Sequence, residues 1–132
     1  MTAVDELAAL HFAAGLPAFP FARRFRLEPW GVPGSPFRLM RSLDDPHLAF
    51  VVTHPKPFFP DFAVDLDNDV VDRLCLRSAD DAFVLVIVTM RENAATANLL
   101  GPIVVNTATS EARQVVLHDS HHDVRTPLPA QS

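Results

Sequence analysis

Proline placement is the feature that most restricts how this chain can fold. Twelve of its 132 residues are proline, whereas a typical protein has about 5%. Ten of them stand at the ends of apolar segments: Pro17, Pro20, Pro29, Pro33, Pro36, Pro46, Pro55, Pro57, Pro60 and Pro102. A proline lacks a backbone N–H and is excluded from central strand positions, so it separates strands rather than occupying them. The spacing therefore predicts a mainly β fold built from many short strands.

The segments between the prolines have the residue patterns of strands. Apolar and polar residues alternate over 25–28, as in a half-buried strand, while the apolar run at 83–90 indicates a strand covered on both faces. Gly101 and Pro102 predict a bulge or kink within one of the strands. The expected strands cover residues 11–13, 25–28, 37–41, 48–52, 83–90, 97–106 and 114–117.

One short helix is expected between these strands. The segment 67–69 (Asp-Asn-Asp) can cap its first turn, and Val70, Val71 and Leu74 fall on one face. Six or seven strands and one helix favour a small β-barrel or half-barrel, because closure leaves few sheet edges exposed. We expect a single domain over 1–132, with flexible ends at 1–9 and 119–132.

Composition and charge narrow the class of protein further. Apolar residues make up 48% and charged residues 20%, the balance of a globular domain. The net charge of −5 disfavours direct binding to nucleic acid. The first residues lack a secretory signal pattern, and no apolar run could cross a membrane, so a cytoplasmic protein is expected. The single cysteine, Cys75, stands between two leucines and is interpreted as a buried thiol.

A histidine-rich segment is the strongest candidate for catalysis. His118, His121 and His122 are interleaved with two aspartates, and such side chains can bind zinc. Zinc ligands usually come from separate, rigid segments with supporting hydrogen bonds, whereas this cluster enters a polar tail. Surface histidines are therefore the favoured interpretation, and we expect neither a metal site nor a cofactor. The chain also lacks a nucleophile-elbow motif and a phosphate-binding glycine loop.

Further candidates are two adjacent carboxylate pairs, Asp44–Asp45 and Asp80–Asp81, and three amides. Asp44 and Asp45 precede a proline, a context in which aspartates usually cap turns rather than share a catalytic pocket. Asn98, Asn106 and Gln114 lie in or beside apolar strands, where asparagine is depleted. These amides either satisfy backbone groups at turns and at the Gly101–Pro102 interruption, or they contribute to recognition of another protein.

Several segments together resemble one known family, the FliW flagellar assembly factors. The similarity runs from about residue 12 to 128, in order and in spacing. The segments that carry it are 15–20 (Gly-Leu-Pro-Ala-Phe-Pro), 42–46 (Ser-Leu-Asp-Asp-Pro), 59–62 (Phe-Pro-Asp-Phe), 98–106 (Asn-Leu-Leu-Gly-Pro-Ile-Val-Val-Asn), 114–117 (Gln-Val-Val-Leu) and 124–128 (Val-Arg-Thr-Pro-Leu).

The chain departs from the family pattern at a few positions. Ala18 replaces the usual glycine, Arg41 a glutamine, Phe62 a tyrosine and Gly101 an alanine. The basic turn before Gln114 here reads Ser-Glu-Ala-Arg, over residues 110–113. The additional carboxylate, Glu111, is expected to affect how partners bind at this loop and not the fold.

The resemblance implies a protein-binding regulator without enzymatic activity. FliW proteins bind flagellin in the cytoplasm and, once it is exported, bind the translational repressor CsrA and relieve its repression of flagellin. Flagellin and CsrA are thus the expected partners, without direct contact to nucleic acid or membrane. A metal-dependent hydrolase using the histidines, or a family member with a different protein partner, are the alternatives. The matched segments suggest partner contacts at Asp44, Asp45, Phe59, Asp61, Asn98, Pro102, Asn106 and Gln114.

Overall fold

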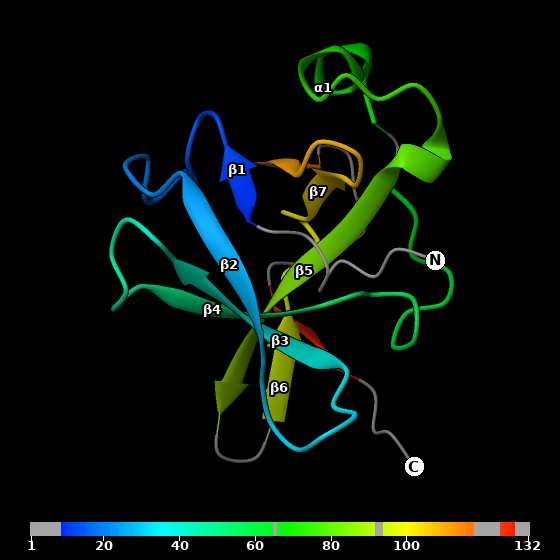
Figure 1. Cartoon of the computed structure of the whole chain (residues 1–132). Coiled ribbons are helices and arrows are strands. Elements are labelled where there is room, and N and C mark those ends of the chain that lie inside the picture. The colour runs from blue at the N-terminus through cyan, green and yellow to red at the C-terminus, as the bar shows by residue number, and fades with distance from the viewer. Residues whose placement is uncertain (1–8, 65, 92–93, 118–124, 129–132) are drawn as a thin grey trace.

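The structure, a computed structural model, describes residues 9–64, 66–91, 94–117 and 125–128 (Figure 1). The described part contains one α-helix, α1 (Asn68–Arg73), and a single-turn 3-10 helix, η2 (Ala79–Asp81). Its strands are β1 (Leu10–Phe12), β2 (Arg24–Pro29), β3 (Phe37–Ser42), β4 (Ala49–Thr53), β5 (Ala82–Arg91), β6 (Ala94–Ala97), β7 (Ile103–Asn106), β8 (Glu111–Gln114) and β9 (Thr126–Pro127).

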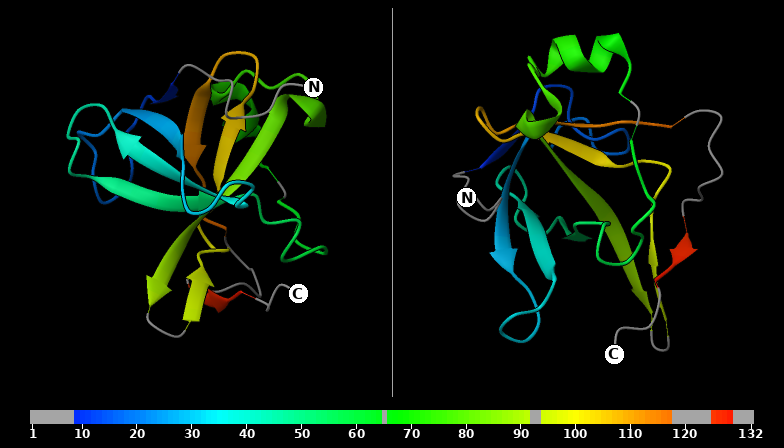
Figure 2. Two further views of the ribbon diagram at one scale, coloured as in Figure 1. Left: turned by 60° about the horizontal axis from the view of Figure 1, so that its bottom comes forward. Right: turned by 90° about the vertical axis from the view of Figure 1, so that its right-hand side faces the viewer.

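Seven of these strands close into a barrel (Figures 1 and 2). Their order is β4-β3-β2-β1-β8-β7-β5, and a β4–β5 pairing completes the ring. All neighbours are antiparallel except β1 and β8, which are parallel. Strands β6 and β9 extend the sheet beyond the barrel through β5. The predicted mainly β barrel with one short helix is confirmed, and it carries more strands than the six or seven expected.

The long strand β5 connects the barrel to this extension. Val88 pairs with Val51 of β4 on one edge and with Ala97 of β6 on the other. Strand β7 pairs with the first half of β5, on the edge that β6 also uses. β6 and β7 therefore form one long strand opposite β5, interrupted between Ala97 and Ile103. The predicted interruption at Gly101 and Pro102 is confirmed, although the strand already begins at Ala94.

The core is divided into three clusters of buried side chains. The largest fills the barrel around Phe12 and Phe25, whose rings meet edge to face with centroids 5.3 Å apart. A second cluster, centred on Phe62 and Leu99, lies outside the barrel wall. A third joins α1 to β7. In the described part of the chain, every buried side-chain nitrogen and oxygen has a hydrogen-bond partner, as expected of a well-formed interior.

Helix α1 forms where the sequence predicts it. The Asp67 carboxylate accepts a 3.0 Å hydrogen bond from the Val70 N–H and caps the first turn. Val70 and Leu74 are buried against Val104 of β7. No described helix has the length and the hydrophobicity needed to span a bilayer.

The interpretation of Cys75 as a buried thiol is wrong. The residue follows the end of α1 with a positive φ of 55°, and its side chain is exposed. The chain must reverse direction after the helix, and the turn points this side chain outward while Leu74 takes the buried position. The exposure of Cys75 is thus set by its position in the turn and not by the two leucines beside it in the sequence.

The C-terminal strands also differ from expectation. The predicted strand at 114–117 is wrong, since β8 covers Glu111–Gln114. Val115 and Leu117 instead donate hydrogen bonds to the Pro102 and Leu100 carbonyls, so they follow the irregular backbone of the interruption. Within the end expected to be flexible, Thr126 and Pro127 form β9 and pair with β6.

Candidate protein-binding surface

One surface collects several of the residues singled out in the sequence. We call it the loop face and define it as residues 55–64, 98–102 and 115–117. The second core cluster underlies it, since Phe59 and Leu117 pack against Phe62 and Leu99. Val116 is 54% exposed between two better buried neighbours. The loop face is thus an irregular surface supported by a rigid apolar layer.

The interruption between β6 and β7 is held open by two amide side chains. Asn98 Oδ1 accepts hydrogen bonds from the backbone N–H groups of Leu100 (3.1 Å) and Gly101 (2.9 Å). Gln114 Nε2 donates to the Gly101 carbonyl at 2.9 Å. A Cβ at Gly101 would lie 2.9 Å from this Nε2 and 3.1 Å from Asn98 Nδ2. Glycine therefore leaves the space that both amides occupy, and both satisfy backbone groups of the loop face.

Asn106 has the same structural role at the other end of β7. Its side chain is buried, donates to the Leu74 carbonyl at 2.7 Å and accepts from the Ala108 N–H at 2.8 Å. Pro102 is also fully buried. A partner protein on the surface therefore has no direct contact with the buried side chains of Asn106 and Pro102. These residues affect binding only by positioning the backbone around them.

Asp44 and Asp45 lie in the β3–β4 turn, away from the loop face. Asp44 accepts hydrogen bonds from the backbone N–H groups of Arg23 (2.9 Å) and Arg24 (3.0 Å), and the Arg24 guanidinium lies 3.3 Å from it. These backbone donors, followed by the guanidinium, hold the pKa of Asp44 below its ordinary value. Asp45 accepts from the His47 N–H. The expected capping of the local turn is confirmed for Asp45. Asp44 instead holds the start of β2, and Ser42 Oγ accepts the Asp44 and Asp45 N–H groups within the turn.

The remaining two candidates lie on the loop face itself. Phe59 is half-buried against the Phe62 cluster, and its N–H donates to the Pro55 carbonyl. Asp61 is exposed, and no described residue forms an ion pair with its carboxylate. The structure thus brings together Phe59, Asp61, Asn98, Pro102 and Gln114. It separates them from Asp44, Asp45 and Asn106.

Comparison with known proteins agrees with this architecture. The model of the family described as FliW protein matches residues 1–128. The chain belongs to the FliW family. It is 38% identical over 133 residues to the flagellar assembly factor FliW of Bacillus licheniformis, covering 99% of this chain and 92% of the relative. The Bacillus subtilis protein of the same name is 36% identical over 131 residues, covering 98% of this chain and 91% of the relative.

A solved FliW structure has the same fold. The crystal structure of the flagellar assembly factor FliW superposes with a TM-score of 0.87 at 28% identity, covering 99% of this chain and 93% of the other. The family resemblance drawn from the sequence motifs is confirmed.

The candidate residues of this FliW-family chain either lie on its surface or hold its turns and loops together. Among the residues that the structure describes, no three His, Cys, Asp or Glu side chains are arranged to hold a metal ion. His118, His121 and His122 lie outside the described residues. The sequence interpretation overlooked a pair of arginines, Arg73 and Arg113, which come from distant segments and line one pocket. No local pattern could have connected them, because 40 residues separate them in the chain.

Proposed function

We propose that this chain is a non-enzymatic regulator in the cytoplasm that binds flagellin and, when flagellin is absent, binds CsrA and relieves its repression of flagellin translation. Membership of the FliW family over residues 1–128 is the observation that carries the proposal. The interior of the barrel is filled by Phe12, Phe25 and their neighbours, so a partner protein has to bind on the outer surface. The loop face offers the mixture of apolar and polar groups that protein interfaces use.

The charge of the segment around α1 supports antagonism of an RNA-binding partner. Residues 67–81 contain five aspartates and two arginines, and Asp67, Asp69, Asp72 and Asp80 are exposed. CsrA binds RNA through basic surfaces. An acidic protein bound beside such a surface raises the free-energy cost of bringing phosphates close. The same acidity disfavours binding of RNA by this chain itself.

Co-purification with the flagellin and CsrA of its own organism tests the proposed partners. We expect each to form a complex with the chain, and flagellin in excess to displace CsrA. If neither protein is retained, the proposed function is wrong. If a different protein is retained in their place, the chain is a family member with another partner.

The electrostatic component has a separate test in the salt dependence of RNA release. The chain is added to a CsrA–RNA complex at several salt concentrations, and released RNA is measured by fluorescence anisotropy. Screening shortens the range of charge interactions from about 10 Å at 0.1 M to about 3 Å at 1 M salt. We expect release to weaken as salt rises. Equal release at low and high salt would exclude the electrostatic contribution while leaving direct binding to CsrA intact.

Substitutions can distinguish residues that contact a partner protein from residues that only support the fold. Phe59→Ala and Asp61→Asn remove side chains at the loop face, and we expect both to weaken partner binding. Asp44→Asn, in the distant β3–β4 turn, is the comparison that tests whether that turn also contacts a partner. Circular dichroism verifies the fold of each variant. Unchanged binding in Phe59→Ala and Asp61→Asn would exclude the loop face as the contact surface.

A further inference from the structure

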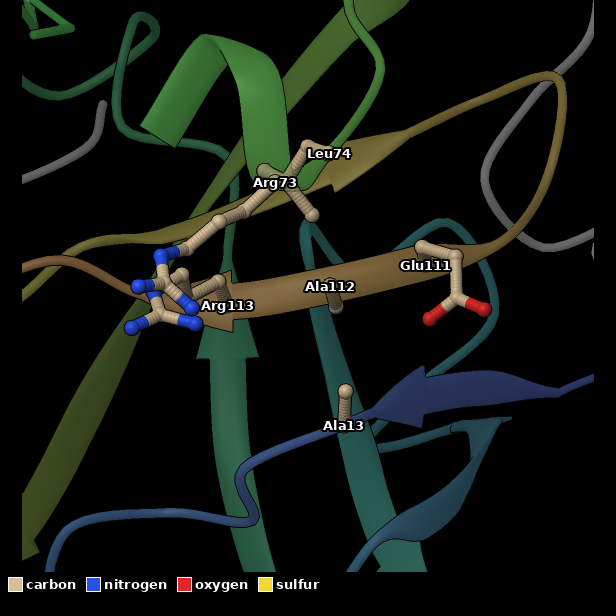
Figure 3. Close-up of a pocket in the computed structure, with 6 residues that line it drawn as sticks. All are labelled: Ala13, Arg73, Leu74, Glu111, Ala112 and Arg113. Atoms are coloured by element: carbon tan, nitrogen blue, oxygen red, sulfur yellow. The ribbon is translucent and has the colours of Figure 1, made fainter. Parts of the chain in front are cut away.

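A small pocket beside α1 contains two arginines from different segments (Figure 3). Its volume is about 170 Å³, below the roughly 300–1,000 Å³ of pockets for drug-sized ligands. The pocket lies between the last turn of α1, strand β8 and the residue that follows β1. Its lining residues are Ala13, Arg73, Leu74, Glu111, Ala112 and Arg113. A pocket of this size suits a single side chain rather than a cofactor.

The two arginine side chains extend toward the same end of the pocket, away from Glu111 (Figure 3). The guanidinium group of Arg113 has no ion pair or hydrogen bond to any residue that the structure describes. Arg73 uses its Nε for Asp69, at 2.9 and 3.0 Å from the two carboxylate oxygens. Its two terminal nitrogens form no hydrogen bond or ion pair with the described residues. Several guanidinium donors therefore face the same space without an acceptor.

The carboxylates that line the pocket or pair with its arginines, those of Glu111 and Asp69, are already engaged. Glu111 Oε2 lies 2.9 Å from His11 Nδ1, at the opposite end of the pocket from the guanidinium groups. Asp69 is held by Arg73 Nε. The end of the pocket that holds the two guanidinium groups therefore lacks an acceptor for their free donors, in a protein whose net charge is −5. Like charges placed together are unfavourable, and an anion between them relieves this cost.

The geometry points to a binding site for one carboxylate, carried by an acidic side chain of a partner protein. Guanidinium groups match the planar carboxylate with paired hydrogen bonds. The small apolar side chains of Ala13, Leu74 and Ala112 suit the short aliphatic stem of such a residue. A polyanion such as RNA would meet Glu111, Asp69 and the acidic surface around α1. A singly charged group therefore fits this site better than a phosphate chain.

A titration followed by NMR on the full chain tests this site. The probe is N-acetyl-glutamate N-methylamide, compared at constant ionic strength with its glutamine counterpart and with inorganic phosphate. We expect the glutamate probe to cause saturable shifts of the Ala112 and Arg113 amides and of the arginine Nε–H signals. The glutamine probe should cause none. Shifts that fail to saturate, or equal binding of the glutamine probe, would overturn the proposal, as would tighter binding of phosphate.

Substitutions then connect the shifts to the two arginines. Arg113→Gln and Arg73→Gln should each weaken binding of the glutamate probe about tenfold, the usual value of a lost charge-assisted hydrogen bond. Arg26→Gln, on the exposed face of β2, is the matched control and should leave binding unchanged. Unchanged binding in Arg113→Gln with an intact fold would also overturn the proposal. These probes contain neither flagellin nor CsrA, so the outcome is independent of the proposed function.

Discussion

The Asn106 side chain donates a 2.7 Å hydrogen bond to the carbonyl of Leu74, 32 residues earlier in the chain. Leu74 follows the last turn of α1, where helix carbonyls have no partner within the helix. The bond therefore ties α1 to the end of β7. It also places Arg73 above strand β8, next to Arg113. One buried amide thus fixes the position of the helix and the shape of the pocket below it.

Removing this amide should destabilise the fold. Asn106→Ala leaves the carbonyl of the buried Leu74 without its partner, which costs about 1–3 kcal/mol, whereas the N–H of the exposed Ala108 can bond to water instead. Urea unfolding followed by fluorescence of the single tryptophan measures the loss. Asn68→Ala, at an exposed position of α1, is the control and should change the free energy of unfolding by less than about 0.5 kcal/mol. An equal effect of both substitutions would contradict the anchoring role.

Substitution of the central aromatic pair should have the largest effect on stability. Phe25 is fully buried and packs edge to face on Phe12. Phe25→Ala creates a cavity in the barrel and should reduce the free energy of unfolding by about 3–5 kcal/mol. Phe21 is 57% exposed, so Phe21→Ala should cost less than about 1 kcal/mol. Denaturant unfolding of the two variants tests whether the barrel interior is the main core.

Two glycines with positive φ should respond differently to alanine. Gly15 has φ +68°, and a Cβ there would overlap with the Pro20 backbone. Gly34 has φ +83°, with nothing within 4 Å of the added atom. Gly34→Ala should cost about 1–2 kcal/mol from backbone strain alone. Gly15→Ala adds steric overlap and should cost roughly 2–4 kcal/mol. Equal losses in urea unfolding would show that the turn around Gly15 can open.

Asp44 should make the stability of the fold depend on pH in the acidic range. Its pKa is lowered in the folded chain, mainly by the N–H groups of Arg23 and Arg24, relative to about 3.9 in the unfolded chain. Its stabilising contribution is therefore complete above that unfolded value. It is lost as pH falls through the lower folded value, because the unfolded state then binds the proton more readily. Asp44→Asn should melt below the parent chain at pH 7, and the difference should shrink as the pH falls below about 4. A difference in melting temperature that is constant with pH would contradict this assignment.

Some elements could be predicted because their signals are local. The cap at Asp67 and the buried face of Val70 fix α1 within a few residues. Gly101 and Pro102 mark the interruption between β6 and β7, since neither residue suits a regular central strand. The FliW motifs likewise lie in contiguous segments. By contrast, the exposure of Cys75 depends on the turn after the helix, which neighbouring residue types do not specify.

Residue patterns alone identify this chain as a mainly β FliW-family protein with strands bounded by prolines. The folded structure was needed to find the parallel β1–β8 pair, the β4–β5 closure, the burial of Asn106 and the meeting of Arg73 with Arg113. The physical reason is that residue patterns specify which face of a strand is buried, whereas strand partners and side-chain neighbours depend on how all strands pack together. Contacts between residues distant in the chain exist only once the barrel has closed.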